Sequence, residues 1–225
     1  MAENAATTVV VAAHLDDAVL SCAGALNPGV ALVTVFAGDP PVGFLGSYDA
    51  STGARSSHDR MDERRLEDRA AAELLGAIPV HLAFPERQYQ RRSGWKGLIK
   101  RGGAPIPTRD EIADALRAHL EQATRVYAPA GFGHNDHLIV RDAVLALRPD
   151  AVLYADLPYT LGAEPAAPPG ITGRSVEVVT LNPDRAQAKV EAFACYGSQL
   201  DPLEAAFGDL LDPTRLGTER LFAAS

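Results

Sequence analysis

An uncharged run near the start of the chain, TTVVVAA at residues 7–13, is the feature that most limits the fold. Its three consecutive valines are typical of a strand that is covered on both faces in a parallel sheet. Further apolar runs predict strands at residues 30–37, 80–84, 125–128, 151–156 and 175–181.

Helical patterns lie between these runs. Residues 60–75 carry apolar side chains at helical spacing, and Gly76 supplies a C-terminal stop, while Thr108 and Glu111 form a capping-box pattern. We expect helices at residues 17–25, 60–75, 108–123, 136–147 and 183–196, and long loops at 38–59 and 86–107. Strands that alternate with helices predict an α/β fold with a doubly wound, mostly parallel sheet and a ligand crevice at the carboxyl ends of its strands.

The composition is that of one globular domain, expected over residues 1–225, since 47% of the chain is hydrophobic and 22% is charged. A net charge of −8 and a pI near 5.2 oppose nucleic-acid binding, which requires a basic face. No run reaches the roughly 20 apolar residues of a membrane span, and residues 1–4 do not resemble a signal peptide. We therefore expect a cytoplasmic protein, and leave open whether it forms a homo-oligomer.

Two clusters of histidine and aspartate follow two of the expected strands. HLDD at residues 14–17 comes directly after the first strand, and HNDH at 134–137 follows the fourth strand after a turn. Parallel strands end at the same sheet edge, so the clusters should converge. Two imidazoles and a carboxylate match a catalytic zinc site that keeps one position for water, and a separate carboxylate can take a proton from that water.

Each cluster also has a structural interpretation. A histidine after a strand often bonds only within its turn, and an aspartate pair there is often a helix N-cap. A non-catalytic metal- or sugar-binding module therefore stays open as the alternative, although a structural metal site has no need of a base. A nucleotide-binding oxidoreductase or methyltransferase is disfavoured, because HLDD stands where a glycine-rich turn would approach a pyrophosphate.

Four short elements of the sequence carry a family resemblance. AHLDD at 13–17 and GHNDH at 133–137 resemble the AHPDD and HPDH elements of the LmbE-like, or PIG-L, zinc-dependent N-deacetylases. RRLE at 64–67 and YGSQ at 196–199 resemble the family's RxxE helix and its C-terminal Tyr-x-Ser-Gln element. The resemblance implies a Rossmann-like fold and hydrolysis of an N-acyl amide, typically N-acetyl, on a small-molecule amino-sugar conjugate.

The resemblance further implies a role for each residue of the metal centre. Zn²⁺, or another divalent metal, would be held by His14, Asp17 and His137. Asp16 would act as the general base.

Other positions match the family's catalytic and substrate-binding residues. His134 would stabilise the oxyanion or protonate the leaving amine, assisted by Asp136. Arg64 matches a substrate-binding arginine, and Glu86 falls near an acidic residue that contacts sugar hydroxyls.

One departure from the family pattern bears on the oxyanion. Phe132 stands where some amino-sugar deacetylases of the family carry a tyrosine, and phenylalanine cannot donate that hydrogen bond. Either the metal and His134 suffice, or Tyr48 or Tyr159 supplies the donor.

A basic segment stands out in this acidic chain. Residues 87–101, RQYQRRSGWKGLIKR, carry six basic side chains and no acidic one. They predict either a flap that stacks on a sugar ring or base and binds a phosphate or carboxylate, or a solvated surface loop. The sequence leaves both interpretations open.

Overall fold

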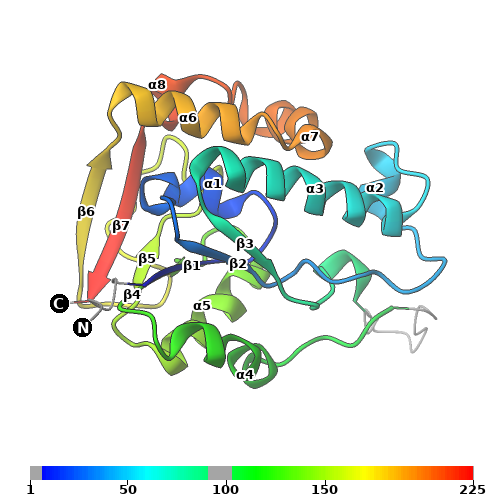
Figure 1. The fold of residues 1–225 in the computed structure, drawn as a ribbon, viewed down its shortest axis with the longest axis horizontal. Coiled ribbons are helices and arrows are strands. Elements are labelled where there is room, and N and C mark those ends of the chain that lie inside the picture. The colour runs from blue at the N-terminus through cyan, green and yellow to red at the C-terminus, as the bar shows by residue number, and fades with distance from the viewer. Residues whose placement is uncertain (1–6, 91–102, 225) are drawn as a thin grey trace.

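A seven-stranded sheet runs through the computed structural model, which describes residues 7–90 and 103–224 (Figure 1). The strands are β1 (Thr8–Ala12), β2 (Ala31–Thr34), β3 (Ile78–His81), β4 (Arg125–Pro129), β5 (Val152–Tyr154), β6 (Arg174–Thr180) and β7 (Thr218–Ala224). Their order is β3-β2-β1-β4-β5-β7-β6. Strands β1 to β5 are parallel, and β7 is antiparallel to both β5 and β6. This confirms the expected α/β fold with a mostly parallel sheet.

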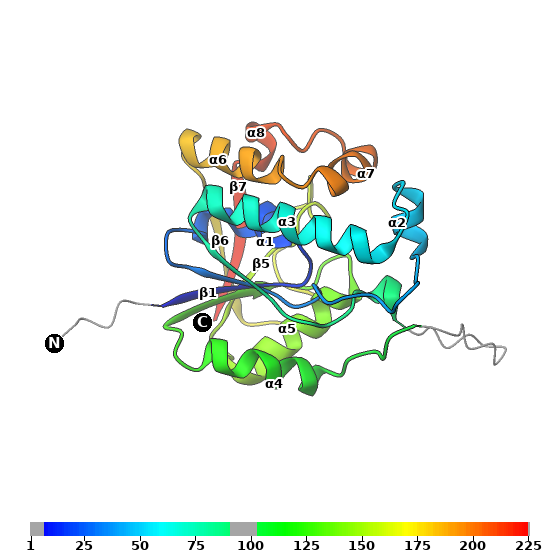
Figure 2. The same cartoon turned by 45° about the vertical axis from the view of Figure 1, so that its right-hand side comes forward.

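Helices cover both faces of the sheet. They are α1 (Asp17–Cys22), α2 (Ser47–Ser51), α3 (Ser57–Leu75), α4 (Arg109–Leu120), α5 (Asn135–Leu147), α6 (Pro183–Phe193), α7 (Gly197–Phe207) and α8 (Pro213–Leu216), with 3₁₀ turns η1 (Ala23–Ala25) and η2 (Arg87–Tyr89). Figures 1 and 2 show α1, α3, α6 and α8 on one face and α4 and α5 on the other. No helix of the described ranges is long and apolar enough to cross a membrane.

The uncharged first run is explained by this arrangement. Side chains alternate across a strand, so Val10 packs into the core beneath α1, α3 and α6, whereas Val9 and Val11 pack into the core above α4 and α5. Strand β1 pairs with β2 on one side and with β4 on the other. Because it lies in the middle of the sheet with both faces covered, its fully buried positions, residues 9–12, are all apolar.

Predicted helix ends are confirmed where a local signal marks them. Gly76 ends α3 in the left-handed conformation at φ 76°, and Thr108 and Glu111 form the capping box of α4. By contrast, the expected loop at 38–59 contains α2 and the start of α3, which begins at Ser57 because Ser56 caps it by accepting from two backbone N–H groups. The third strand lies slightly earlier than the predicted range of 80–84.

Strand β7 was not predicted, and it completes the sheet. The segment TERLFAA combines charged and apolar residues without a clear period, and Glu219 within it is buried. The Nζ atom of Lys189 on α6 lies 2.9 Å from Oε1 of Glu219, and the backbone N–H of Gly24 donates to the same carboxylate. A buried ion pair thus joins β7 to the helices above it.

Most of the predicted basic segment lies outside the described residues. Its first four residues, 87–90, are described and include the 3₁₀ turn η2. Residues 91–102 are not among those described.

Candidate active site

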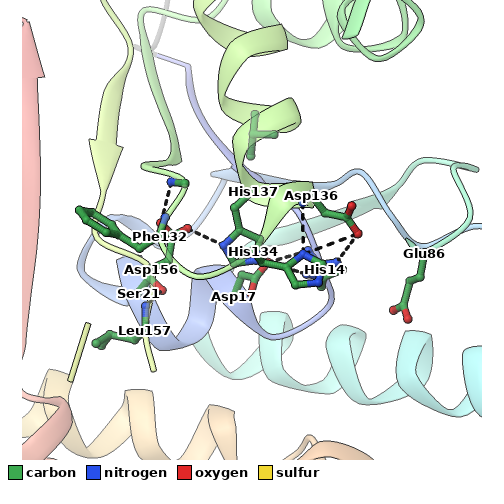
Figure 3. Close-up of polar contacts among 12 residues, drawn as sticks. His14, Asp17, Ser21, Glu86, Phe132, His134, Asp136, His137, Asp156 and Leu157 are labelled. Carbon is green, nitrogen blue, oxygen red and sulfur yellow. Dashed lines mark hydrogen bonds and ion pairs between the residues drawn. The ribbon is translucent and has the colours of Figure 1, made fainter. Parts of the chain in front are cut away.

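The two histidine and aspartate clusters meet at the carboxyl edge of the sheet, as predicted from the parallel strands. Strands β1 and β4 are neighbours, and each leads directly into a short turn and a helix. Asp16 stands at the N-cap of α1, and His134 stands at the N-cap of α5. Figure 3 shows the side chains of both clusters pointing toward one another.

Three potential ligand atoms form a nearly equilateral triangle. Nδ1 of His14 lies 3.3 Å from Nε2 of His137, and Oδ2 of Asp17 lies 3.4 Å and 3.2 Å from these two nitrogens. Ligands bound tetrahedrally to zinc at about 2.0–2.2 Å are about 3.3–3.6 Å apart. The spacing of the three atoms therefore fits one small divalent metal ion.

A buried carboxylate orients His137. Nδ1 of His137 lies 2.8 Å from Oδ1 of Asp156, and both side chains are almost completely buried (Figure 3). Oδ2 of Asp156 accepts the backbone N–H groups of Gly131 and Phe132, so this carboxylate is fixed in place. A carboxylate only accepts hydrogen bonds, so Nδ1 carries the proton and Nε2 is left as the metal-binding nitrogen.

A second carboxylate orients His14 in the same way. Nε2 of His14 lies 3.1 Å from Oδ2 of Asp136, which leaves Nδ1 of His14 facing the triangle. Sequence reasoning expected Asp136 to assist His134, yet Nδ1 of His134 lies 3.8 Å from that carboxylate. In this geometry the close partner of Asp136 is His14.

His134 belongs to the same cluster but differs in its hydrogen bonding. One nitrogen from each of His14, His134 and His137 lies within 4.8 Å of the others, so His134 is a rival ligand on distance alone. However, Nδ1 of His134 accepts the backbone N–H of Asp136 at 3.2 Å. A neutral ring that accepts at Nδ1 carries its proton on Nε2, which makes Nε2 a hydrogen-bond donor. Burial, with the nearby charge of His14, lowers the pKa of His134 to about 4, so this ring is neutral at pH 7.

Asp16 is distinguished by its backbone and by its free carboxylate. It is the only residue other than glycine with positive φ in the described ranges, at φ 130°, and such strain is often found at functional sites. Its carboxylate accepts no hydrogen bond from the described part of the chain, unlike Asp17, Asp136 and Asp156. Burial and the charge of Asp17 raise the pKa of Asp16 to about 8. Asp16 therefore places in the cleft a carboxyl group that can gain or lose a proton near neutral pH.

The pKa values of His14 and His137 are raised. Burial alone lowers the pKa of His137, but the charge of Asp17 and the hydrogen bond to Asp156 outweigh burial and raise it to about 9. The pKa of His14 is likewise raised, because hydrogen bonds to Asp136 and Asp17 overcome its burial. The positive charge of a protonated imidazole thus offsets the negative charge of the neighbouring carboxylates.

Arg64 and Glu86 both line the cleft, and they bind each other. They form a buried ion pair, and Glu86 also accepts from Nε2 of Gln88 at 2.9 Å. Arg64 is 4% exposed and Glu86 6% exposed, so these predicted substrate-binding residues form part of the cleft wall. The charge of Arg64 also opposes the rise in the pKa of Asp16.

The cleft over the triangle has a volume of about 310 Å³. Its polar wall holds Asp16, Asp17 and His134, and Leu157 and Leu203 are part of its apolar wall. This is enough space for a small group beside the candidate metal ligands.

Phe132, Tyr48 and Tyr159, the aromatic residues considered for the oxyanion, differ in what they contact. Phe132 packs against Phe222, 6.2 Å between ring centroids, and its ring points away from the histidines (Figure 3). The hydroxyl of Tyr48 donates to Gln199 at 3.2 Å. Tyr159 lines the cleft, and its hydroxyl makes no hydrogen bond with the described residues. Of the two tyrosines, Tyr159 is therefore the one with an uncommitted donor.

Packing fixes the ring of Tyr159. It lies edge-on to His137, 5.7 Å between centroids, and edge-on to Phe207 at 5.8 Å. It also lies so close to Gly133 that any side chain there would collide with it, and Gly133 has a φ of 76°. Glycine is required at this turn for both reasons.

Sequence reasoning missed Asp156 as a site residue. The signal was present, because Asp156 ends the predicted strand at 151–156 and so lies at the same sheet edge as the two clusters. A lone aspartate without a neighbouring histidine did not stand out. Its partner, His137, is distant in the sequence.

A family model matches the part of the chain that holds both clusters. The sequence model of the family described as PIG-L, GlcNAc-PI de-N-acetylase, matches residues 9–148, which include both clusters. No curated protein matches the chain significantly by sequence.

Solved structures share the fold. The zinc-inhibited form of teicoplanin deacetylase Orf2 has a TM-score of 0.79 at 24% identity, over 96% of this chain and 97% of that chain. The A40926 pseudoaglycone deacetylase Dbv21 has a TM-score of 0.75 at 24% identity, over 96% of each chain. N,N'-diacetylchitobiose deacetylase from Pyrococcus horikoshii has a TM-score of 0.58 at 18% identity, over 93% of this chain and 76% of that chain. With more than half of its length matched by the family model, the chain belongs to the PIG-L (GlcNAc-PI de-N-acetylase) family.

Proposed function

We propose that this protein is a zinc-dependent N-deacetylase that hydrolyses the acetamide of a small amino-sugar conjugate. The observation that carries the proposal is the triangle of His14, Asp17 and His137 with the uncommitted carboxylate of Asp16 beside it. Family membership supports the reaction class. The names of the similar structures, which include deacetylases of teicoplanin and of N,N'-diacetylchitobiose, support an acetylated sugar as substrate.

The three ligand residues would hold one divalent ion. A metal ion in such a site polarises the amide carbonyl and lowers the pKa of water. Asp136 and Asp156 keep the two imidazoles in the tautomers that this binding requires. Zinc suits a site of two nitrogens and one oxygen, and the donor set admits other divalent metals.

Asp16 would act as the general base. It takes one proton from the attacking water as the water oxygen bonds to the amide carbonyl carbon. A base with a pKa near the working pH transfers protons efficiently, and a bound cation would lower the pKa of Asp16 below its metal-free value of about 8. The proton then passes to the amide nitrogen as the C–N bond breaks, which gives a carboxylic acid and an amine; proton transfer between them leaves a carboxylate and an ammonium group.

His134 and Tyr159 would stabilise the oxyanion that forms on the carbonyl oxygen. The neutral His134 ring presents Nε2–H as a donor, because Nδ1 accepts the N–H of Asp136. The Tyr159 hydroxyl is another available donor in the cleft. Donors that are already in position stabilise the oxyanion effectively, because the site does not have to reorganise as the transition state forms.

The test separates the base from the ligands. Zinc-loaded protein should release acetate and free amine in equal amounts from N-acetylglucosamine conjugates. Asp16→Asn should lower kcat by about 10²- to 10⁴-fold and retain zinc, because it removes a base without removing a ligand. Asp17→Asn should lose zinc as well as activity, with metal content measured by atomic emission after gel filtration.

A non-catalytic binding module predicts a different result. Such a protein would retain zinc and release no amine from any member of a broad panel of N-acyl sugars. Loss of zinc from Asp16→Asn would instead make Asp16 a ligand and remove its assignment as the base.

A further inference from the structure

A second, larger cavity shares part of its lining with the candidate active-site cleft. This neighbouring cavity has a volume of about 550 Å³, against about 310 Å³ for the cleft. Arg87, Gln88 and His134 line both of them. Phe44 and Leu45, from the loop before α2, contribute an apolar wall to the second cavity. A molecule bound at the candidate metal ligands can therefore extend past Arg87 into this space.

The guanidinium of Arg87 stands at this junction with its donors uncommitted. It makes no hydrogen bond within the described ranges, and its nearest carboxylate oxygen is Oδ1 of Asp136 at 3.8 Å. Its side chain is 53% exposed. An arginine presents five N–H groups in a planar fork that matches a carboxylate or a phosphate.

Two neighbouring polar side chains are already paired with carboxylates. Arg64, the other arginine that lines the cleft, is buried against Glu86. Gln88 donates through Nε2 to both Glu86, at 2.9 Å, and Asp49, at 3.2 Å. Of the arginine and lysine side chains that line either space in the described part of the chain, Arg87 is thus the one that donates no hydrogen bond to a carboxylate.

We propose that Arg87 selects substrates with an anionic group, a phosphate or a carboxylate, on the amine-bearing part of the molecule. The proposal rests on the proposed deacetylation. An acetyl group is small and uncharged, so the bulk of the conjugate and any anion belong to the amine side and extend toward the second cavity. The basic character of residues 87–101 agrees with a negatively charged substrate.

The experiment compares a neutral and an anionic substrate. N-acetylglucosamine and N-acetylglucosamine 1-phosphate are hydrolysed by zinc-loaded wild type, Arg87→Gln and Arg87→Lys. We expect Arg87→Gln to lower kcat/KM for the phosphate about 10- to 100-fold, the range of a charge-assisted contact, with less than a threefold change for the neutral sugar. Arg87→Lys should restore part of the preference, because it keeps the charge and loses the fork.

A matched control tests the effect of charge alone. Arg117 on α4 is 51% exposed, close to the 53% of Arg87, and it lines neither the cleft nor the second cavity. Arg117→Gln removes the same charge and should change kcat/KM for neither sugar. Equal losses on both sugars in Arg87→Gln would show that Arg87 acts through Asp136, and no loss on either would leave it a solvated side chain; both results overturn the proposal.

A binding measurement separates this proposal from the proposed reaction. Calorimetric titration of zinc-loaded Asp16→Asn with the two sugars reports affinity without turnover. The phosphate sugar should bind more tightly than the neutral sugar, and adding Arg87→Gln should remove that difference. If the difference persists without Arg87, the phosphate binds elsewhere, for example to the metal, and selection by Arg87 is refuted. Failure of hydrolysis in the wild type, with Arg87-dependent binding intact, would refute only the proposed reaction.

Discussion

Nδ1 of His137 lies 2.8 Å from Oδ1 of Asp156, and neither side chain has meaningful contact with solvent. The contact joins the helix after β4 to the end of β5, so two neighbouring strands determine the position of one imidazole. The contact could not be inferred from the sequence, because the two residues are far apart along the chain. The parallel pairing of β4 and β5 brings them together.

We predict that Asp156→Asn weakens zinc binding about 10- to 100-fold, the range found for partners of ligand histidines. The amide cannot accept from His137 and from two backbone N–H groups as the carboxylate does. Competition with a chromophoric chelator measures the affinity. Asp184→Asn, an exposed aspartate on α6, is the control, and equal affinity in both variants would contradict the assigned role.

Metal binding should release protons. Without a bound cation the pKa of His137 is about 9, so this ring carries both protons at pH 7, and the pKa of His14 is raised in the same direction. A cation requires their free lone pairs and lowers the pKa of the nearby Asp16 carboxyl, so protons should leave as the ion binds at pH 7. Apparent affinity should therefore rise with pH through the pKa of His137, about 9. Calorimetry in buffers of different ionisation enthalpy counts the protons, and a count of zero would show that the rings are neutral.

Removing one hydroxyl should slow the reaction without changing the fold. Tyr159→Phe keeps the ring contacts with His137 and Phe207 but removes the donor. We expect kcat to fall about 10- to 100-fold, a modest effect among oxyanion donors, with zinc content and melting temperature unchanged. Tyr127→Phe, on β4 and outside the cleft lining, is the control. An unchanged kcat in Tyr159→Phe would leave His134 as the sole side-chain donor.

The ion pair between Lys189 and Glu219 predicts a stability effect. Lys189→Met leaves the buried Glu219 carboxylate without its cation and should lower the free energy of unfolding by about 3–5 kcal/mol. Adding Glu219→Leu removes the unpaired charge and should restore most of that loss. Urea denaturation measures the free energy of unfolding of Lys189→Met, Glu219→Leu and the double variant. A double variant as unstable as the sum of the two single variants would show that the residues do not interact.

Much of the fold could be predicted because local signals agreed with the tertiary arrangement. The valine run at 7–13 required a strand with both faces covered, and Gly76 and Thr108 marked helix ends that depend on neighbouring backbone atoms alone. Strand β7 could not be predicted, because Glu219 looks like a surface residue until Lys189 and Gly24 are placed beside it. Its strand character comes from contacts with distant segments.

The candidate site was predictable to the same extent. HLDD and HNDH follow adjacent parallel strands, so their convergence followed from topology. Which carboxylate serves which histidine depends on side-chain directions, and Asp136 therefore proved to be the close partner of His14. The ion pair between Arg64 and Glu86 could not be predicted either, because it also depends on side-chain directions.

The position of β7 has a consequence for the order in which the protein matures during synthesis. Strand β5 ends just before Asp156, and one of its edges is covered by β7, whose Arg220 carbonyl accepts the N–H of Ala155. A nascent chain that has not yet released residues 218–224 from the ribosome lacks this support for the residue that orients His137. In the proposed metal site, tight binding of the ion therefore requires that residues 218–224 have first paired with β5.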